Sequence, residues 1–335
     1  MKRWIGAVLA AALAAGAIAV PDSGGPKPVA EATSGSPMQV VGFWANDAFS
    51  GLSGLYKYPH AVTWFTPFWY SVNASGNLVN RTVPSILKEV QKKHILVTPL
   101  VNDMTGTQAF LTSSGTLINA ARNIADMVKA NHFAGVSIDF EPQHIRLAPE
   151  LTRFVIDLRD RLPKGSVITM SVVPHSGGAY QWSALNPEVN QYILMSYDEH
   201  DDGSYAGPVA ATPWVQRIVA RIKRKVPPGK IDLGVALYGY EWPKGSTHAV
   251  TIPYNAVTPT MNKYAKWDSA DQETYAMFTT ASMGPVVVWW ESLQGMNQKI
   301  QLAKDDHLAG IALWHVGYAN NSVYQLLLHQ VGRQP

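Results

Sequence analysis

The chain has 335 residues, of which 47% are hydrophobic and 15% are charged, so it holds enough apolar material for one large core. Its formal net charge is only +3, and two of the positive charges, Lys2 and Arg3, lie in a segment that we expect to be removed, so a nucleic-acid partner has little electrostatic support. The absence of cysteine excludes disulfides, thiolate metal sites, a cysteine nucleophile and a lipid anchor on cysteine.

The first 37 residues have the composition of a targeting segment and a linker. A basic start precedes an apolar run over 5–20, and Ala17-Ile18-Ala19 fits the small-x-small pattern of a cleavage site. We expect a signal peptide over 1–19 and a mature N-terminus near Val20. The run is short for a membrane span, which takes about 20 residues, but an uncleaved anchor remains the alternative. Residues 20–37 are rich in Pro, Gly and Ser, which predicts a flexible linker.

From residue 38 onward, short apolar runs alternate with helical patterns. The runs are nearly continuous, as in strands buried on both faces. Between them, apolar residues recur with helical spacing, for example at Val83, Ile86, Leu87 and Val90. The expected strands are 39–43, 61–66, 95–101, 135–139, 167–173, 192–197, 231–236 and 310–314. This alternation predicts a (β/α)8 TIM barrel over 38–332, although an open doubly wound sheet has similar periodicity.

A long stretch between the seventh and eighth expected strands breaks this rhythm. Within it, residues 274–280 and 285–291 have the pattern of a strand pair, with a turn at Ser282-Met283-Gly284. We therefore expect a small α+β insertion between strands 7 and 8, over about residues 240–290.

The segment 133–142 carries two closely spaced carboxylates. Side chains alternate along a strand, so Ser137, Asp139 and Glu141 are expected to share the face that points into the barrel. Buried carboxylates need compensation, and the carboxyl ends of barrel strands are where active sites lie. The pair therefore indicates a catalytic site, whereas the plainer reading is a structural ion pair with a basic residue of the barrel.

The same segment resembles the signature D-x-x-D-x-D-x-E of glycoside hydrolase family 18, the chitinase family. Asp139 matches the third acidic position and Glu141 the catalytic one, whereas Ala134 and Ser137 stand where the family has aspartates. The Met195-Ser196-Tyr197-Asp198 stretch is similar to the family's M-x-Y-D motif. The motifs occur in the family's order, each at the end of an expected strand.

Further motifs resemble one bacterial branch of the family, which acts on peptidoglycan and includes spore-cortex N-acetylglucosaminidases. These motifs are M-S-Y-D-E-H over 195–200, G-Y-E-W over 239–242 and A-L-W over 312–314. The similarity extends over about residues 38–330. It implies a glycosidase that is secreted or held in the cell envelope, which includes association with spores. Its expected partner is a polysaccharide or peptidoglycan containing N-acetylglucosamine.

The resemblance also implies a substrate-assisted retaining mechanism, in which the sugar's own N-acetyl oxygen attacks the anomeric carbon. Glu141 would protonate the glycosidic oxygen, Asp139 would hold the acetamido N–H, and Tyr197 would donate to the acetamido carbonyl. Trp314 would form the floor under the reacting sugar, and Asp198 would bind the sugar or its neighbours. Further candidates for substrate binding are Ser137, Met195, Phe43, Trp69, Asn102, Tyr238 and Trp242.

Two other interpretations are considered. A non-catalytic chitinase-like sugar-binding protein of the cell envelope or spore coat is favoured by Ala134 and Ser137, but such proteins typically lose the acid that Glu141 retains. The acidic run over 198–202 resembles a metal cluster, but its spacing is not that of a ligand set, and 201–204 has the composition of a turn. We therefore expect neither metal nor cofactor, and no membrane span once the signal is removed. Chitin versus peptidoglycan, and endo versus exo cleavage, stay open.

Overall fold

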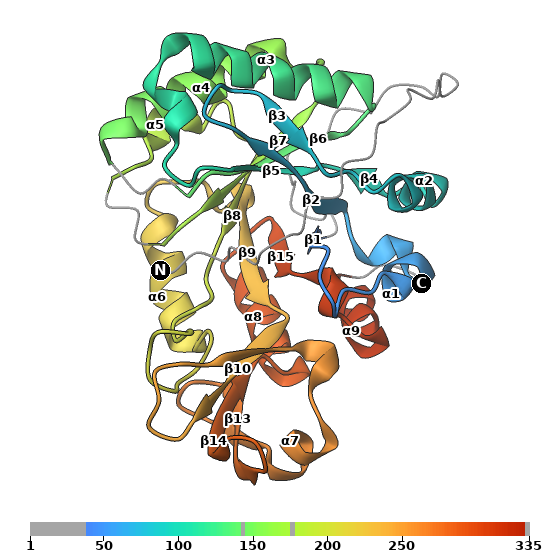
Figure 1. Ribbon diagram of the computed structural model, residues 1–335, viewed down its shortest axis with the longest axis vertical. Coiled ribbons are helices and arrows are strands. Elements are labelled where there is room, and N and C mark those ends of the chain that lie inside the picture. Colours follow the sequence, from blue (N-terminus) through green and yellow to red (C-terminus); the bar gives the residue numbers. More distant parts are fainter. Residues whose placement is uncertain (1–37, 142–144, 175–177, 332–335) are drawn as a thin grey trace.

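The computed structural model describes residues 38–141, 145–174 and 178–331, so the expected signal peptide and linker lie outside the described residues. Eight parallel strands form a closed barrel (Figure 1), because β1 pairs with both β15 and β2. In order around the barrel, the strands are β1 (Gln39–Trp44), β2 (Trp64–Val72), β5 (Leu100–Asp103), β6 (Gly135–Asp139), β7 (Val167–Val172), β8 (Gln191–Leu194), β9 (Ile231–Ala236) and β15 (Gly310–Trp314). The predicted barrel is confirmed, and the open sheet is excluded.

Helices alternate with the strands and form the outer layer. They are amphipathic: α4, for example, buries Leu151, Phe154, Val155 and Leu158, which recur at helical spacing. The fifth helix of the series is only one turn long, whereas α3 and α4 are the longest. The helices of this layer are α1 (Ser53–Lys57), α2 (Pro84–Lys92), α3 (Ser114–Ala130), α4 (Ala148–Arg161), α5 (Trp182–Leu185), α6 (Thr212–Ile222), α8 (Leu293–Asp305) and α9 (Asn321–Val331).

Two of the expected strands have different bounds. The second begins three residues later than predicted, because a 3-10 turn over Pro59–Ala61 precedes it, and it extends to Val72 and pairs with β3 (Leu78–Asn80). The third is divided into β4 (Leu96–Val97) and β5. Pro99 lies between these two pieces and has no N–H to donate to a neighbouring strand.

The phase of alternation decides which side chains enter the barrel. The interior holds an apolar cluster of Val41, Phe43, Trp64, Leu100, Val167, Ile193 and Ala312. Leu100 is in register with Ser137, and Asn102 with Asp139. Residues in register on parallel neighbours point to the same side of the sheet, so Ser137 and Asp139 also face the interior, as expected from the sequence.

The insertion between β9 and α8 is a five-stranded antiparallel sheet with one helix, α7 (Pro259–Tyr264). It lies at the opposite end of the molecule from α3 and α4 (Figure 1). The order of its strands is β11-β10-β14-β13-β12. Their bounds are β10 (Tyr238–Pro243), β11 (Val250–Pro253), β12 (Lys266–Asp268), β13 (Glu273–Thr280) and β14 (Gly284–Trp290). The expected α+β insertion, including its strand pair, is thus present as β13 and β14.

Buried charges join this insertion to the barrel. Lys299 of α8 is completely buried, and its Nζ lies 2.7 Å from Oε2 of Glu291, which directly follows β14 and is buried as well. Glu273, at the start of β13, accepts hydrogen bonds from the backbone amides of Val209 and Ala210, both at 2.8 Å. Removing one partner of such a buried pair leaves an uncompensated charge, which costs about 3–5 kcal/mol.

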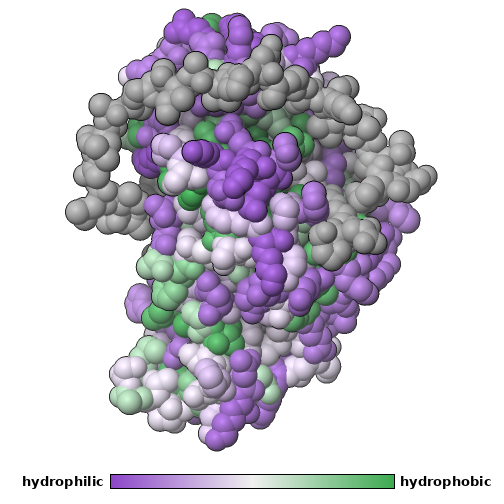
Figure 2. Space-filling view, turned by 90° about the vertical axis from the view of Figure 1, so that its right-hand side faces the viewer, coloured by the Kyte–Doolittle hydropathy of each residue, from purple (hydrophilic) through white to green (hydrophobic). Residues whose placement is uncertain are grey.

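The outer surface combines charged and apolar side chains. The face drawn in Figure 2 is mostly hydrophilic, with apolar residues in small groups between polar ones. Over the residues that the structure describes, no helix has both the length and the apolar composition needed to cross a membrane.

Candidate active site

Asp139 is the last residue of β6 and lies half-buried at the mouth of the barrel. Burial, together with the negative charge of Glu141, raises the pKa of the Asp139 carboxyl to about 8, although a hydrogen bond with the Ser171 side chain opposes this shift. Two carboxyl groups that interact in this way hold a proton between them at neutral pH, which is a common arrangement in catalytic sites.

Glu141 follows two residues later, beyond the end of the strand. Its φ of 42° lies in the left-handed region, so the strict alternation that we assumed stops at Asp139. The preceding residue is firmly held: the Phe140 carbonyl accepts a 2.8 Å hydrogen bond from Nε2 of buried Gln108, and its ring packs edge-on against Phe110. The Glu141 side chain itself is exposed, so it is accessible to a substrate.

Tyr197 and Asp198 follow β8 at the same mouth. Burial raises the pKa of Tyr197 well above 10, and the negative charges of Asp139 and Asp198 add to this effect, which places the phenol close to both carboxyls. Tyr197 is therefore a neutral donor at any working pH. Asp198, whose φ is 60°, accepts hydrogen bonds on Oδ1 from the hydroxyls of Tyr238 (2.6 Å) and Tyr240 (2.9 Å).

Trp314 closes the site from the opposite side, since β15 lies across the barrel from β6. The indole is partly exposed and packs against the ring of Phe43, with centroids 5.6 Å apart. The Trp314–His315 peptide bond is cis. A flat, partly exposed aromatic ring at this position can pack against a sugar ring.

The other predicted residues divide into two groups. Asn102 and Met195 are half-buried at the barrel mouth, and Tyr238 donates a hydrogen bond to Asp198, so all three lie near the acidic residues and their part in substrate binding stays a prediction. Trp69, Trp242 and Ser137 are completely buried and Phe43 is only 2% exposed, so these side chains have almost no surface for a sugar. Their burial argues against contact with a sugar, and their part in substrate binding stays a prediction.

The burial of each has a physical reason. Trp69 lies one position out of phase with the interior residues of β2, so it faces the helices and packs edge-on against Phe65. Trp242 lies on β10 of the insertion and donates its indole N–H to the Ser204 carbonyl at 3.0 Å. Ser137 lies two residues before Asp139 on β6, deeper in the barrel.

Because Trp69 is core, Trp69→Phe should destabilise the fold without affecting substrate affinity. The smaller ring leaves a gap in the packing, for which we expect a loss of about 1–3 kcal/mol in the free energy of unfolding. Denaturant unfolding and the KM for a sugar oligomer would check this. A marked rise in KM with unchanged stability would show instead that Trp69 contacts the sugar.

Sequence reasoning missed three residues that shape the site. Ser171 bonds Asp139, Gln108 holds the residue before Glu141, and buried Tyr180 has a pKa raised by burial and by the charges of both carboxyls. Ser171 could have been found, because it lies on an expected strand in the interior phase. Gln108 and Tyr180 are in connecting segments without a distinctive pattern.

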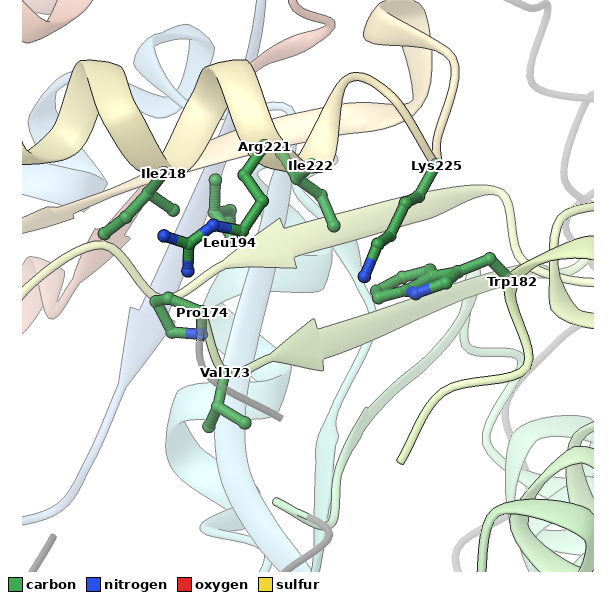
Figure 3. Close-up of a pocket in the computed structure, with 8 residues that line it drawn as sticks. All are labelled: Val173, Pro174, Trp182, Leu194, Ile218, Arg221, Ile222 and Lys225. Atoms are coloured by element: carbon green, nitrogen blue, oxygen red, sulfur yellow. The ribbon is translucent and has the colours of Figure 1, made fainter. Parts of the chain in front are cut away.

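A separate cavity lies on the outer side of the barrel, between α5 and α6 (Figure 3). Because α5 is only one turn long, the ends of β7 and β8 are incompletely covered there. Its walls are apolar apart from two cations at the rim, Arg221 and Lys225, and the Lys225 ammonium lies 6.0 Å from the ring centre of Trp182. It contains no carboxylate, so it is not the site of acid chemistry.

Nothing in the described part of the chain brings three His, Cys, Asp or Glu side chains together as a metal ion would require. The acidic run after β8 is used instead in bonds to the protein. Asp198 accepts from the two tyrosines, and Glu199 accepts a 3.0 Å hydrogen bond from the amide of Ala211.

Comparison with known families agrees with this geometry. The profile described as glycosyl hydrolases family 18 matches residues 39–319, which contain all eight barrel strands and the insertion. The chain belongs to glycosyl hydrolase family 18. The expected class of enzyme, a glycosidase of this family, is thereby confirmed.

Several similar proteins come from species of Bacillus. The uncharacterized glycosylase YvbX of Bacillus subtilis is 22% identical, and the match covers 98% of this chain and 98% of YvbX. A cortical fragment-lytic enzyme of Bacillus cereus is 25% identical over 80% of this chain and 67% of the relative. YdhD of B. subtilis is 27% identical over 74% of this chain, but this chain spans only 64% of the length of YdhD.

Solved structures show the same fold. The spore cortex-lytic enzyme SleL of B. cereus superposes with a TM-score of 0.79 over 88% of this chain and 74% of SleL, at 18% identity. A chitinase from Chromobacterium violaceum superposes with a TM-score of 0.80 over 89% of this chain and all of the chitinase, at 19% identity.

Proposed function

We propose that this protein is an exported N-acetylglucosaminidase of the chitinase type, which cleaves a β-linked polymer containing N-acetylglucosamine by substrate-assisted retaining catalysis. The observation that carries the proposal is the electrostatic coupling of Asp139 to Glu141, with the neutral phenol of Tyr197 beside them. These are the three groups that such a mechanism needs, at the mouth of a barrel where active sites lie.

In the first step, the acetamido oxygen of the bound sugar attacks its own anomeric carbon as the glycosidic C–O bond breaks. Glu141 transfers its proton to the departing oxygen, so the leaving sugar is neutral. Asp139, now the ionised partner, accepts the acetamido N–H and stabilises the positive oxazolinium ring. Tyr197 donates its hydroxyl to the acetamido oxygen and orients it for attack.

In the second step, water opens the ring. Glu141, now a carboxylate, accepts a proton from the attacking water, and the sugar recovers its N-acetyl group with the original anomeric configuration. The acid is thereby restored for the next turnover. Asp198, fixed by Tyr238 and Tyr240, holds the segment that carries Tyr197, and Trp314 supports the sugar ring from below.

The substrate class is tested by product analysis. Purified peptidoglycan and chitin oligomers would be digested, and the fragments sequenced by mass spectrometry. We expect new reducing ends at N-acetylglucosamine. Release of muramic acid ends, or no release from either polymer, would contradict the proposal. The spore-lytic relatives support peptidoglycan, and the chitinase structures support chitin.

Export is part of the proposal and has its own test. The basic start, the apolar run over 5–20 and Ala17-Ile18-Ala19 support cleavage near Val20. N-terminal sequencing of protein collected from the medium or the cell envelope should find this new end. An intact Met1 on that protein would refute cleavage.

The alkaline side of the pH profile should be set by the carboxyl pair. Below about pH 8 the pair keeps a proton for Glu141 to donate, and above it that proton is lost, so kcat/KM should fall about tenfold per pH unit. In Ser171→Ala the hydrogen bond that lowers the pKa of Asp139 is missing, so the fall should move to higher pH. Initial rates from pH 5 to 10 would check both.

An identical alkaline limb in the wild type and in Ser171→Ala would show that Asp139 does not set that limb.

The raised pKa of Asp139 also has a consequence for the stability of the fold, with a definite sign. The folded state binds this proton more tightly than the unfolded state does, so the stability contributed by Asp139 decreases as the pH rises from 3.8 towards about 8.

A further inference from the structure

A second cleft adjoins Trp314. It is a shallow cleft whose space of about 300 Å³ is open to solvent. Its walls come from the segment after β1, the start of β10, the strand β11 and the segment after β15. The lining residues are Ala45, Asp47, Tyr238, Thr251, Trp314, His315 and Tyr318. Because Trp314 is shared with the proposed floor, a sugar in this cleft would neighbour the reacting sugar.

Asp47 is the charged group of this cleft, and it is held rigidly. Its Oδ2 accepts from the Tyr318 hydroxyl at 2.7 Å and lies 3.2 Å from Nε2 of His315. Its Oδ1 accepts from the Phe49 amide at 2.9 Å and from the Ser50 hydroxyl at 3.1 Å. The side chain is nevertheless 35% exposed, so part of the carboxylate remains accessible from the cleft.

The carboxylate of Asp47 is held by the His315 imidazole and by hydroxyl and amide donors. Nδ1 of His315 accepts a 3.1 Å hydrogen bond from the Gly317 amide, so the N–H that faces Asp47 is the one on Nε2. Burial opposes ionisation of Asp47, but the hydrogen bonds from His315, Tyr318 and the Phe49 amide keep its pKa below the usual value. None of the residues that line the cleft is a lysine or an arginine.

Resting on the function proposed above, we infer that this cleft binds a glucosamine unit with a free ammonium group next to the N-acetylglucosamine over Trp314. Asp47 attracts the ammonium and repels a sugar that bears a carboxylate. The reacting sugar must keep its acetyl group, because the acetamido oxygen is the nucleophile. The enzyme therefore prefers partly de-N-acetylated chains, and it cleaves them at a fixed position relative to the unacetylated sugar.

The test uses partially de-N-acetylated chitin oligomers, with products sequenced by mass spectrometry. In the wild type, glucosamine should be enriched at one fixed position beside the cleaved N-acetylglucosamine. Two unit charges about 6 Å apart in a half-exposed cleft change this preference by roughly three- to tenfold. Asp47→Asn should lose that factor, and high salt should reduce it in the wild type.

Two control variants separate charge from structure. Asp160→Asn removes an exposed carboxylate of α4, remote from the cleft, and should keep the preference. Tyr318→Phe removes one donor to Asp47 but leaves its charge, and should keep the preference as well. The inference is overturned if Tyr318→Phe loses as much as Asp47→Asn, if Asp47→Asn matches Asp160→Asn, or if the wild type excludes glucosamine from that position.

Binding to the inactive Glu141→Gln variant tests the cleft without turnover. Calorimetry should give a three- to tenfold tighter Kd for a tetrasaccharide with one glucosamine than for the fully acetylated one. Equal affinities would refute the glucosamine site but leave the proposed function intact. Failure of the wild type to cleave any acetylated polymer would refute the proposed function instead. Oligomers from de-N-acetylated peptidoglycan, run beside those from chitin, identify which polymer supplies the glucosamine.

Discussion

Glu141→Gln should lower the turnover of an N-acetylglucosamine polymer by about 10²–10⁴, the range that a positioned general acid contributes. The amide keeps the shape of the side chain but has no proton to give to a departing oxygen. Glu141 is exposed and follows the strand, so the substitution removes no core packing. Release of reducing ends from chitin oligomers and peptidoglycan measures the loss.

The same variant should fold normally and still bind sugar. Its thermal unfolding should match that of the wild type, and its Kd for an oligomer should change little. A thiazoline analogue of the oxazolinium ring should inhibit the wild type. Full activity of the variant would remove Glu141 as the acid, and a trapped covalent bond between the sugar and Asp139 would replace substrate assistance by a two-carboxylate mechanism.

Tyr197→Phe should lower kcat by about 10²–10³, by analogy with the loss of a hydrogen-bond donor to a developing charge. The phenol is buried beside Asp139 and stays protonated, so it can donate throughout the working pH range. Removing only the hydroxyl leaves its ring contact with Tyr238, whose centroid lies 6.2 Å away. Steady-state kinetics would show the loss in kcat, with a smaller effect on KM.

Tyr264→Phe is the matched control, because that tyrosine is exposed on the insertion, away from the barrel mouth. It should have wild-type kinetics. An unchanged kcat in Tyr197→Phe, with the fold intact, would show that Tyr197 has no part in the reaction.

The elements that repeat regularly were predictable from the sequence. Strand and helix periodicities predicted the alternation of strands and helices and the insertion, and alternation along β6 correctly placed Ser137 and Asp139 inside. The chemistry of these strand ends came from the family motifs. Pattern alone could not choose between a closed barrel and an open sheet, because closure depends on the pairing of β1 with β15.

What failed depended on phase or on contacts distant in the sequence. Trp69 lies within β2, one position out of phase with the interior residues, and therefore faces the helices. The anchoring of Phe140 by Gln108 joins positions 32 residues apart, and the bond from Tyr238 to Asp198 joins positions 40 apart. Such pairs leave no local periodicity, so only the folded structure reveals them.

The buried pair of Lys299 and Glu291 has a consequence for how this protein can be altered or could have arisen. Lys299 belongs to the barrel layer, whereas its counter-charge comes from the end of the inserted sheet. A shortened protein that lacks the insertion would retain a buried ammonium without a partner, so the excision would have to be accompanied by replacement of Lys299 with an apolar residue such as methionine. The insertion therefore cannot be exchanged between barrels as an independent unit. Among related barrels, we expect a lysine at position 299 only where the inserted sheet is present.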